Sequence, residues 1–67
     1  MAPRKTVATR LKELRKRRGW SQEQLAKKAR VGRPNLARLE TARQDPTLRT
    51  LEKLAKALGV KVGRLVE

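Results

Sequence analysis

The side chains of this sequence that could perform chemistry are chiefly arginines and lysines, and they offer the binding of anions rather than catalysis. Within residues 21–40 two short helical patterns are separated by a break, and the second pattern begins beside Arg30 and Arg33. An arginine guanidinium is a planar fork that matches phosphate oxygens and the O6 and N7 edge of guanine. Two short helices around a tight break are typical of a helix-turn-helix, which indicates DNA as the ligand.

The overall charge favours the same class of ligand. The 67 residues include 19 Lys and Arg against 6 Asp and Glu, which gives a formal charge of +13, and there is no His to change it near neutral pH. So basic a chain seeks polyanions, of which nucleic acid is the commonest, with anionic lipid or simple solubility as alternatives. The length allows one small domain with a modest core.

Composition argues against several other classes of protein. Without Cys or His the chain has no thiolate or imidazole to ligate a metal, no disulfide and none of the commonest catalytic bases. The six carboxylates are scattered, and no glycine-rich phosphate loop is present, so we expect no enzyme activity, metal or cofactor. No apolar run reaches the length of a signal peptide or membrane span, which predicts a cytoplasmic protein without a membrane partner.

The first part of the chain is predicted to be a tail followed by a helix. Residues 1–5 contain two cations and a proline, which predicts a flexible basic N-terminal tail. From residue 6 apolar side chains recur at helical spacing up to Gly19, so the domain is expected over residues 6–67. Arg17 and Arg18 suit the negative end of the first helix dipole, and phosphate contact is a second interpretation that can hold together with it.

The second helix has a strong start signal. Ser21 is a good N-cap, and Gln24 three residues later completes a capping box. Trp20 and Leu25 have the spacing of a hydrophobic staple around that cap. The polar face of this helix is simply solvated unless Gln22 faces a phosphate.

The third helix is expected to begin at Arg33 or Pro34, because proline is tolerated only in a first helical turn. Its inward side carries two leucines, with Glu40 beside them. The opposite side carries small residues and one cation: Pro34, Ala37, Arg38 and Thr41. A face of this kind can enter a DNA groove.

The remaining residues predict one strong helix and an apolar ending. Thr47 is an N-cap, and the apolar stripe that follows ends at Gly59 and comprises Leu48, Leu51, Leu54, Ala55 and Leu58. Residues 60–66 could form a short turn that closes the core or an oligomer contact, and we favour core closure because small domains need every apolar group. The fold class is thus all-α, a compact bundle of four to five short helices with a helix-turn-helix formed by the second and third.

Several positions together resemble the helix-turn-helix of Cro and phage repressors: Ser21, Gln22, Leu25, Ala26, Val31, Leu36, Leu39, Glu40, Pro46 and residues 51–58. The resemblance covers the first helix through residue 66. It implies a five-helix bundle that presents its third helix to the major groove of double-stranded DNA, usually as a homodimer on a two-fold site. It also implies a sequence-specific transcriptional regulator, with repression as the expected mode.

The resemblance assigns roles to single residues. Direct base contacts fall on Arg33, Pro34, Ala37 and Arg38. Phosphate contacts fall on Gln22, Thr41 and Arg43, to which Arg17 and Arg18 add the interpretation given above. Arg15 and Glu40 match a structural ion pair that orients the third helix. Two arginines at reading positions predict a target rich in guanine, and Pro34 can offer only apolar contact, for example to a thymine methyl.

This chain departs from the family pattern at four positions, one of which is Pro34, where the family often has a hydrogen-bonding side chain. Arg30 stands where the family usually has a Gly in a left-handed turn, which costs a residue with a Cβ about 1 to 2 kcal/mol, so Gly32 is an alternative site for the turn. Gly32 also replaces the usual Ser or Thr cap of the third helix, and Ala42 replaces a common Gly.

Other functions stay open at this point. An antitoxin or a restriction controller has the same fold, and only a partner protein or neighbouring gene would distinguish them. A basic module that coats nucleic acid without reading sequence is a further alternative, since phosphate contacts supply most of the affinity of any such protein. An amphipathic membrane binder is disfavoured, because the chain has a single aromatic residue.

Overall fold

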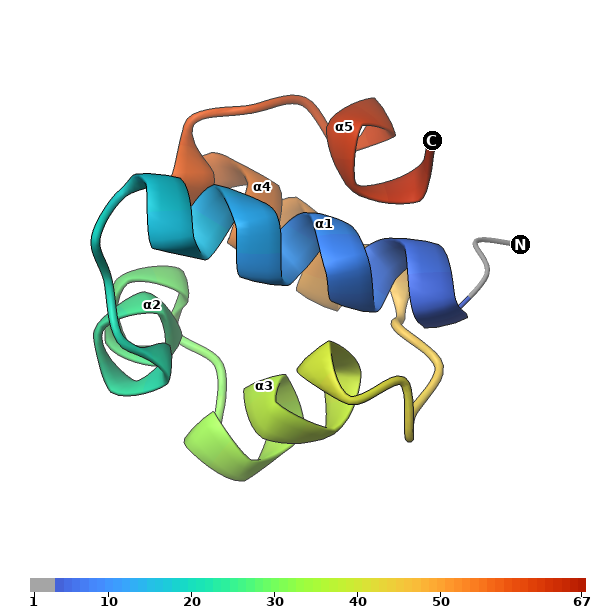
Figure 1. The fold of residues 1–67 in the computed structure, drawn as a ribbon, viewed down its shortest axis with the longest axis horizontal. Coiled ribbons are helices and arrows are strands. Elements are labelled where there is room, and N and C mark those ends of the chain that lie inside the picture. Colours follow the sequence, from blue (N-terminus) through green and yellow to red (C-terminus); the bar gives the residue numbers. More distant parts are fainter. Residues whose placement is uncertain (1–3) are drawn as a thin grey trace.

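Five helices follow one another along the chain in the computed structural model, which describes residues 4–67 (Figure 1). They are α1 (Arg4–Arg17), α2 (Gln22–Ala29), α3 (Arg33–Glu40), α4 (Leu48–Leu58) and α5 (Gly63–Val66). The predicted all-α class is confirmed, and the last apolar segment forms the short fifth helix. None of the helices in this part of the chain is both long and apolar enough to cross a bilayer.

The helices surround a core built from leucine, valine and alanine side chains. α1 packs on α3 and α5, and α2 packs on α3 and α4. In Figure 1, α1 runs across the molecule, with α3 below it and α5 above it. Every helix contributes one or two leucines from its inward face to the largest buried side chains. These leucines are Leu11, Leu25, Leu36, Leu39, Leu54, Leu58 and Leu65.

The first helix begins earlier than expected. Of the predicted tail over residues 1–5, Arg4 and Lys5 form the first turn of α1, and residues 1–3 lie outside the described residues. The Arg4 guanidinium forms two hydrogen bonds with the Asp45 carboxylate in the α3–α4 loop, the Nη2 bond being 3.1 Å. The hydrogen bond from Arg4 lowers the pKa of Asp45 below its ordinary value. This exposed pair ties the start of α1 to the loop.

Two helices start at the predicted caps. The Ser21 Oγ accepts from the Gln24 N–H at 3.1 Å, and the Gln24 Oε1 accepts from the Ser21 N–H at 2.8 Å, so the capping box is confirmed. Thr47 caps α4 through the Thr50 N–H at 3.1 Å. Gly32 precedes α3 without a side-chain cap, as its lack of a side chain requires.

All four longer helices end in the same way. The residue after each helix, or shortly after it, is left-handed: Gly19 (φ 69°), Arg30 (φ 57°), Ala42 (φ 58°) and Gly59 (φ 71°). The next N–H then bonds a carbonyl five residues back, as from Val31 to Ala26 at 3.0 Å. This is the Schellman motif, which satisfies carbonyls that a helix end leaves free.

Two of these four positions lack the glycine that the motif favours. The alternative that Gly32 takes up the turn after α2 is wrong, because Gly32 is extended with φ −67° and Arg30 itself is left-handed. Ala42 likewise adopts the conformation of the glycine it replaces. The helix ends are therefore retained at the cost of local strain.

The end of the chain and the start of α4 differ in burial. Leu65 of α5 is fully buried, which supports core closure rather than an oligomer contact for that side chain. Leu48, expected in the apolar stripe of α4, is 66% exposed. It is the first residue of the helix, and helical side chains lean toward the N-terminus, so this one points past the helix end.

Replacing Ala42 by glycine should stabilise the domain by about 0.5 to 1 kcal/mol. The substitution removes left-handed strain of about 1 to 2 kcal/mol, and the added freedom of the unfolded chain offsets part of that gain. The free energy of unfolding from urea titration measures it. The matched control Ala57→Gly, within α4, should instead destabilise by about 1 kcal/mol; a loss of stability in both variants would contradict the strain at Ala42.

Candidate nucleic-acid interface

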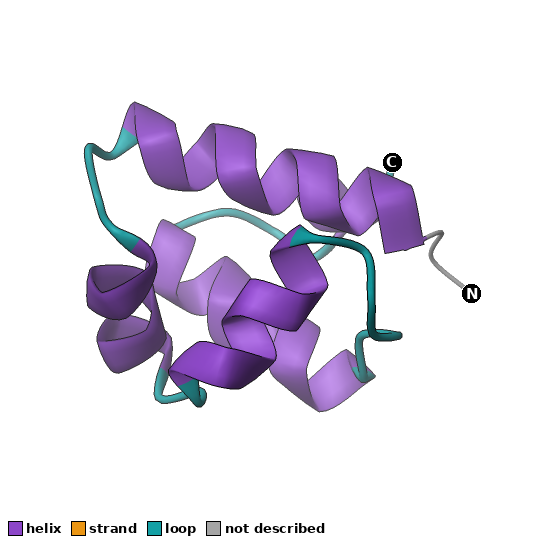
Figure 2. Cartoon of the chain, turned by 60° about the horizontal axis from the view of Figure 1, so that its bottom comes forward, coloured by secondary structure: helices purple, strands orange, loops and turns teal. Residues whose placement is uncertain are grey.

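The exposed face of α3 gathers the predicted base-contact residues. At about 100° per residue they occupy one arc of the helix: Arg33, Ala37, Thr41, Pro34 and Arg38 in order around the axis. All are exposed except Ala37, which is half-buried. Figure 2 shows α3 in the foreground with α2 beside it. The structure thus brings together two guanidinium groups on a narrow face of small residues.

A buried polar network holds this face in place. The Glu40 carboxylate at the end of α3 accepts from the Arg15 Nε at 2.8 Å and from the Arg15 Nη2 at 2.9 Å. Gln22, the first residue of α2, donates to the same carboxylate at 3.2 Å. The remaining Arg15 nitrogen donates to the Trp20 carbonyl at 2.9 Å. One carboxylate therefore joins α1, α2 and α3.

Burial makes the Arg15–Glu40 pair a structural contact rather than a surface one. The Glu40 side chain is 2% exposed and that of Arg15 is 13% exposed. The hydrogen bonds to Glu40 raise the pKa of Arg15 above its ordinary value, against the opposite effect of burial. A buried carboxylate requires paired donors, and the bidentate guanidinium together with the Gln22 amide supplies them.

Three of the predicted phosphate-binding residues lie beside α3, and they differ in the hydrogen bonds that their side chains already make: Gln22, Thr41 and Arg43. The Gln22 amide has a second N–H beyond the one bound to Glu40. The Thr41 hydroxyl donates to the carbonyls of Ala37 and Arg38, at 3.0 and 3.2 Å, so it caps the helix end. Arg43 is exposed, and its guanidinium forms no ion pair within residues 4–67.

Asn35 has a structural role. Its Oδ1 accepts a hydrogen bond of 2.6 Å from the Gln44 amide, and both side chains are half-buried. This bond fastens the loop after α3 back onto the helix. The polar residue on the side of α3 therefore positions the loop that carries Arg43.

Arg18 contacts the end of α4 rather than α3. Its Nη2 donates to the Leu58 carbonyl at the end of α4 at 2.7 Å, and its guanidinium lies 5.5 Å from the centre of the Trp20 ring. A Cβ on Gly59 would come within 2.9 Å of that nitrogen. Arg18, which was predicted to contact phosphate, therefore joins the end of α1 to the end of α4. The lack of a side chain at Gly59 leaves space for its guanidinium.

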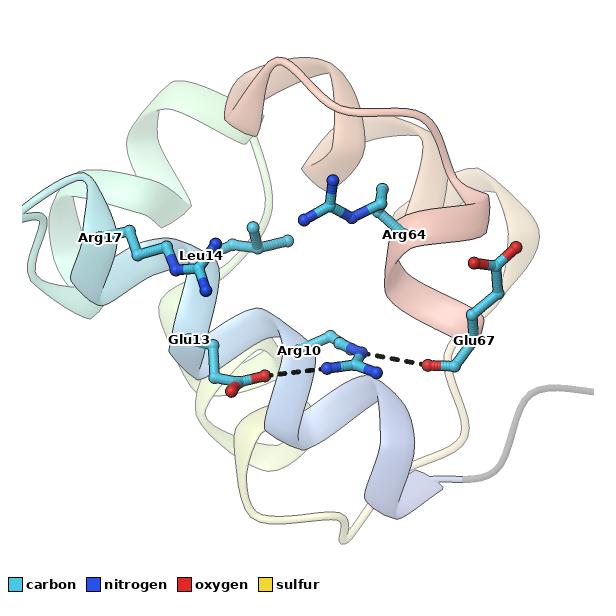
Figure 3. Close-up of a pocket in the computed structure, with 6 residues that line it drawn as sticks. All are labelled: Arg10, Glu13, Leu14, Arg17, Arg64 and Glu67. Carbon is cyan, nitrogen blue, oxygen red and sulfur yellow. Dashed lines mark hydrogen bonds and ion pairs between the residues drawn. The ribbon is translucent and has the colours of Figure 1, made fainter.

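Arg17 also lies away from α3. It is about 200° around α1 from Arg15, the side chain that faces α3. It lines a hollow of about 190 Å³ between α1 and α5, shown in Figure 3 with Arg10, Glu13, Leu14, Arg64 and Glu67. Arg17 and Arg18 are thus the two predicted phosphate contacts that the structure does not bring to the α3 face.

Three residues beside α3 were not predicted from the sequence as DNA contacts. Lys5, Thr9 and Lys12 repeat along α1 at helical spacing and line a shallow hollow next to Glu40, Thr41 and Ala42. Both lysines are exposed. Their polar stripe was visible in the sequence, but only the packing of α1 on α3 shows that it borders the candidate interface.

A five-helix bundle in which α2 and α3 meet around a short left-handed turn defines the class of helix-turn-helix domains. The sequence matches the helix-turn-helix family HTH_3 over residues 11–65, and the chain belongs to that family. The resemblance drawn from the sequence is thereby confirmed.

Relatives of this chain carry regulatory names. The immunity repressor protein of Bacillus phage phi105 is 48% identical over 61 residues, which make up 91% of this chain and 42% of that protein. The HTH-type transcriptional regulator DdrOP3 of Deinococcus deserti is 41% identical over 61 residues, or 91% of this chain and 47% of that protein. The matched residues span less than half the length of each of these two relatives.

Solved structures match the fold closely. The hypothetical transcription factor NHTF from Neisseria superposes with a TM-score of 0.93 at 34% identity, covering 97% of this chain and 75% of that one. The restriction-modification controller protein C.AhdI from Aeromonas hydrophila has a TM-score of 0.89 at 32% identity, covering 92% of this chain and 94% of that one. Both support the bundle described above.

The variant Glu40→Gln should destabilise the domain by about 3 kcal/mol, because it leaves the buried Arg15 guanidinium without a counter-charge. Urea unfolding of the purified domain measures the change. Asp45→Asn is the matched control, since it removes the exposed partner of Arg4 by the same chemical change and should alter stability little. Equal effects of the two substitutions would show that burial of the Arg15–Glu40 pair has no energetic consequence.

Proposed function

We propose that this domain binds double-stranded DNA by placing α3 in the major groove, with Arg33 and Arg38 reading base edges. The observation that carries the proposal is the exposed arc of α3, where two guanidinium groups flank small residues. Each guanidinium can form a bidentate contact with guanine, which gives about 1 to 3 kcal/mol of discrimination against another base. Ala37 and Pro34 leave room for close approach and offer apolar contact to thymine.

Phosphate contacts would orient the domain on the duplex. Gln22 is the first residue of α2 and donates to Glu40 at the end of α3, and Arg43 lies in the loop after α3. Lys5 and Lys12 extend this border along α1. Such contacts fix register and supply affinity without reading sequence. Thr41 would join them only by giving up its capping bond to a backbone carbonyl.

The biological role that fits this binding is transcriptional regulation, with repression by occupying promoter DNA as the preferred mode. The support comes from the regulatory names of the relatives, one of which is a phage immunity repressor. The longer relatives contain additional sequence, so the proposal concerns the DNA-binding activity of this domain and not the activity of those whole proteins.

We expect a homodimer on a two-fold DNA site, because one domain of this size presents only one short recognition helix. Half-sites should lie one helical turn apart, about 34 to 36 Å. Selection of bound fragments from random duplex DNA should return a guanine-containing inverted repeat with that spacing. Recovery of fragments without any shared motif would favour the non-specific coating module instead.

Replacing Arg38 by alanine should relax discrimination at one base pair of each selected half-site, by about 1 to 3 kcal/mol. The test compares affinities for the selected duplex and for single-base variants at fixed salt. Arg64→Ala on α5 is the matched control, since it removes the same charge outside the α3 face. Base reading by Arg38 is refuted when its loss weakens binding equally for every duplex.

A restriction controller is the second candidate function. The support is the similarity to the solved controller C.AhdI, which superposes with a TM-score of 0.89 at 32% identity. The selected DNA motif separates the two candidates when it is located in the source genome. A position upstream of restriction and modification genes would support the controller, whereas phage or unrelated promoters would support the general regulator.

A further inference from the structure

A second basic surface lies away from the α3 face. Between the end of α2 and the middle of α4 there is a groove of about 650 Å³, lined by Lys28, Ala29, Arg30, Lys53, Lys56 and Ala57. None of these lining residues belongs to α3. The groove is lined from the end of α2 and from α4, whereas the predicted base-contact residues lie on α3.

The four cations of this groove are not neutralised by the protein. All four are exposed, and none lies within 4.0 Å of a carboxylate among residues 4–67. The Lys28 ammonium lies over the face of the Trp20 ring, 4.8 Å from its centre. Four positive charges around one concavity repel each other and focus the potential, which attracts an anion into the groove.

The shape of the groove suits a ridge of phosphates. Its lining includes two small side chains, Ala29, which is buried, and Ala57, which is half-buried. The cations come from two helices, and their long stems can adjust to successive phosphates on both sides. A nucleic-acid backbone presents one charge for each nucleotide along such a ridge.

The composition of the groove favours nucleic acid over a protein partner. Lysine and alanine are depleted in the centres of protein interfaces, and they make up five of the six lining residues. The lining offers no aromatic or large aliphatic side chain to anchor a peptide. Lysine and arginine are, in contrast, the usual partners of DNA phosphates.

We propose that the α2–α4 groove is a second DNA-binding site, which holds the phosphate backbone of another duplex segment without reading its sequence. One domain can then bind its specific site through α3 and a second segment through this groove, so that it bridges two pieces of DNA. The inference rests on the proposed function in one respect, namely that α3 holds the first duplex.

The test uses two duplexes. The selected specific duplex is immobilised, protein is bound to it, and capture of a labelled random-sequence duplex is measured over a range of salt concentrations. The wild-type domain should capture the second duplex. The variant Lys53→Gln/Lys56→Gln should lower the salt slope of that capture by about 1.8, since each lost phosphate contact removes about 0.9. Its affinity for the immobilised duplex should change by less than about twofold.

The control variant Lys27→Gln/Lys61→Gln removes the same net charge from exposed lysines outside the groove. It should retain capture of the second duplex. Thermal unfolding checks that both double variants fold, and glutamine keeps the helical preference of lysine in α4.

Several results would overturn the bridging site. These are failure of the wild-type domain to capture a second duplex, capture by Lys53→Gln/Lys56→Gln with the affinity and salt slope of the wild type, and equal loss in both double variants. Polyglutamate that binds the wild type but not Lys53→Gln/Lys56→Gln, while both capture DNA alike, would assign the groove to acidic proteins instead. Failure of specific binding to the immobilised duplex is a separate outcome, which counts against the proposed function of α3.

Discussion

The buried contact between Arg15 and Glu40 is the constraint on which the rest of this domain depends. α3 has eight residues and no side-chain cap at its start, so it is too short to be stable alone. Packing of its leucines fixes its depth against the core, but apolar contacts are not directional. The bidentate ion pair adds direction, because its planar geometry is satisfied only at one rotation of α3. The same carboxylate accepts from Gln22, so the start of α2 is bound to the end of α3.

The helix starts and most of the core could be predicted from sequence because their signals are local. Ser21, Gln24 and Thr47 cap the helices that follow them, and the apolar periodicity identifies the buried faces. The Arg15–Glu40 pair could be predicted only through the resemblance, since 25 residues separate the partners. The resemblance also placed a left-handed turn at position 30, but the cost of a Cβ in that conformation left Gly32 as an alternative until the backbone angles were known.

The positions and partners of the arginine and lysine side chains were the hardest feature to predict from the sequence. A basic run at the end of α1 is compatible with a helix dipole, a phosphate or another helix, and the sequence does not distinguish these. In the structure Arg18 reaches the carbonyl end of α4, while Arg17 faces α5. Conversely, Lys5 and Lys12 reach the border of α3 only because α1 packs against it. Net charge therefore indicates the class of ligand, whereas packing decides which charges are available to it.

Trp20 lies where these parts of the structure meet. Its carbonyl accepts from Arg15, and its ring has the Arg18 guanidinium and the Lys28 ammonium over it. The sequence contains no other tryptophan and no tyrosine or phenylalanine. The intrinsic near-ultraviolet absorbance and fluorescence of this chain therefore come from a single ring at the junction of α1 and α2. An unlabelled sample therefore carries its own optical probe, which contacts both Arg15 of the buried ion pair and Lys28 of the α2–α4 groove.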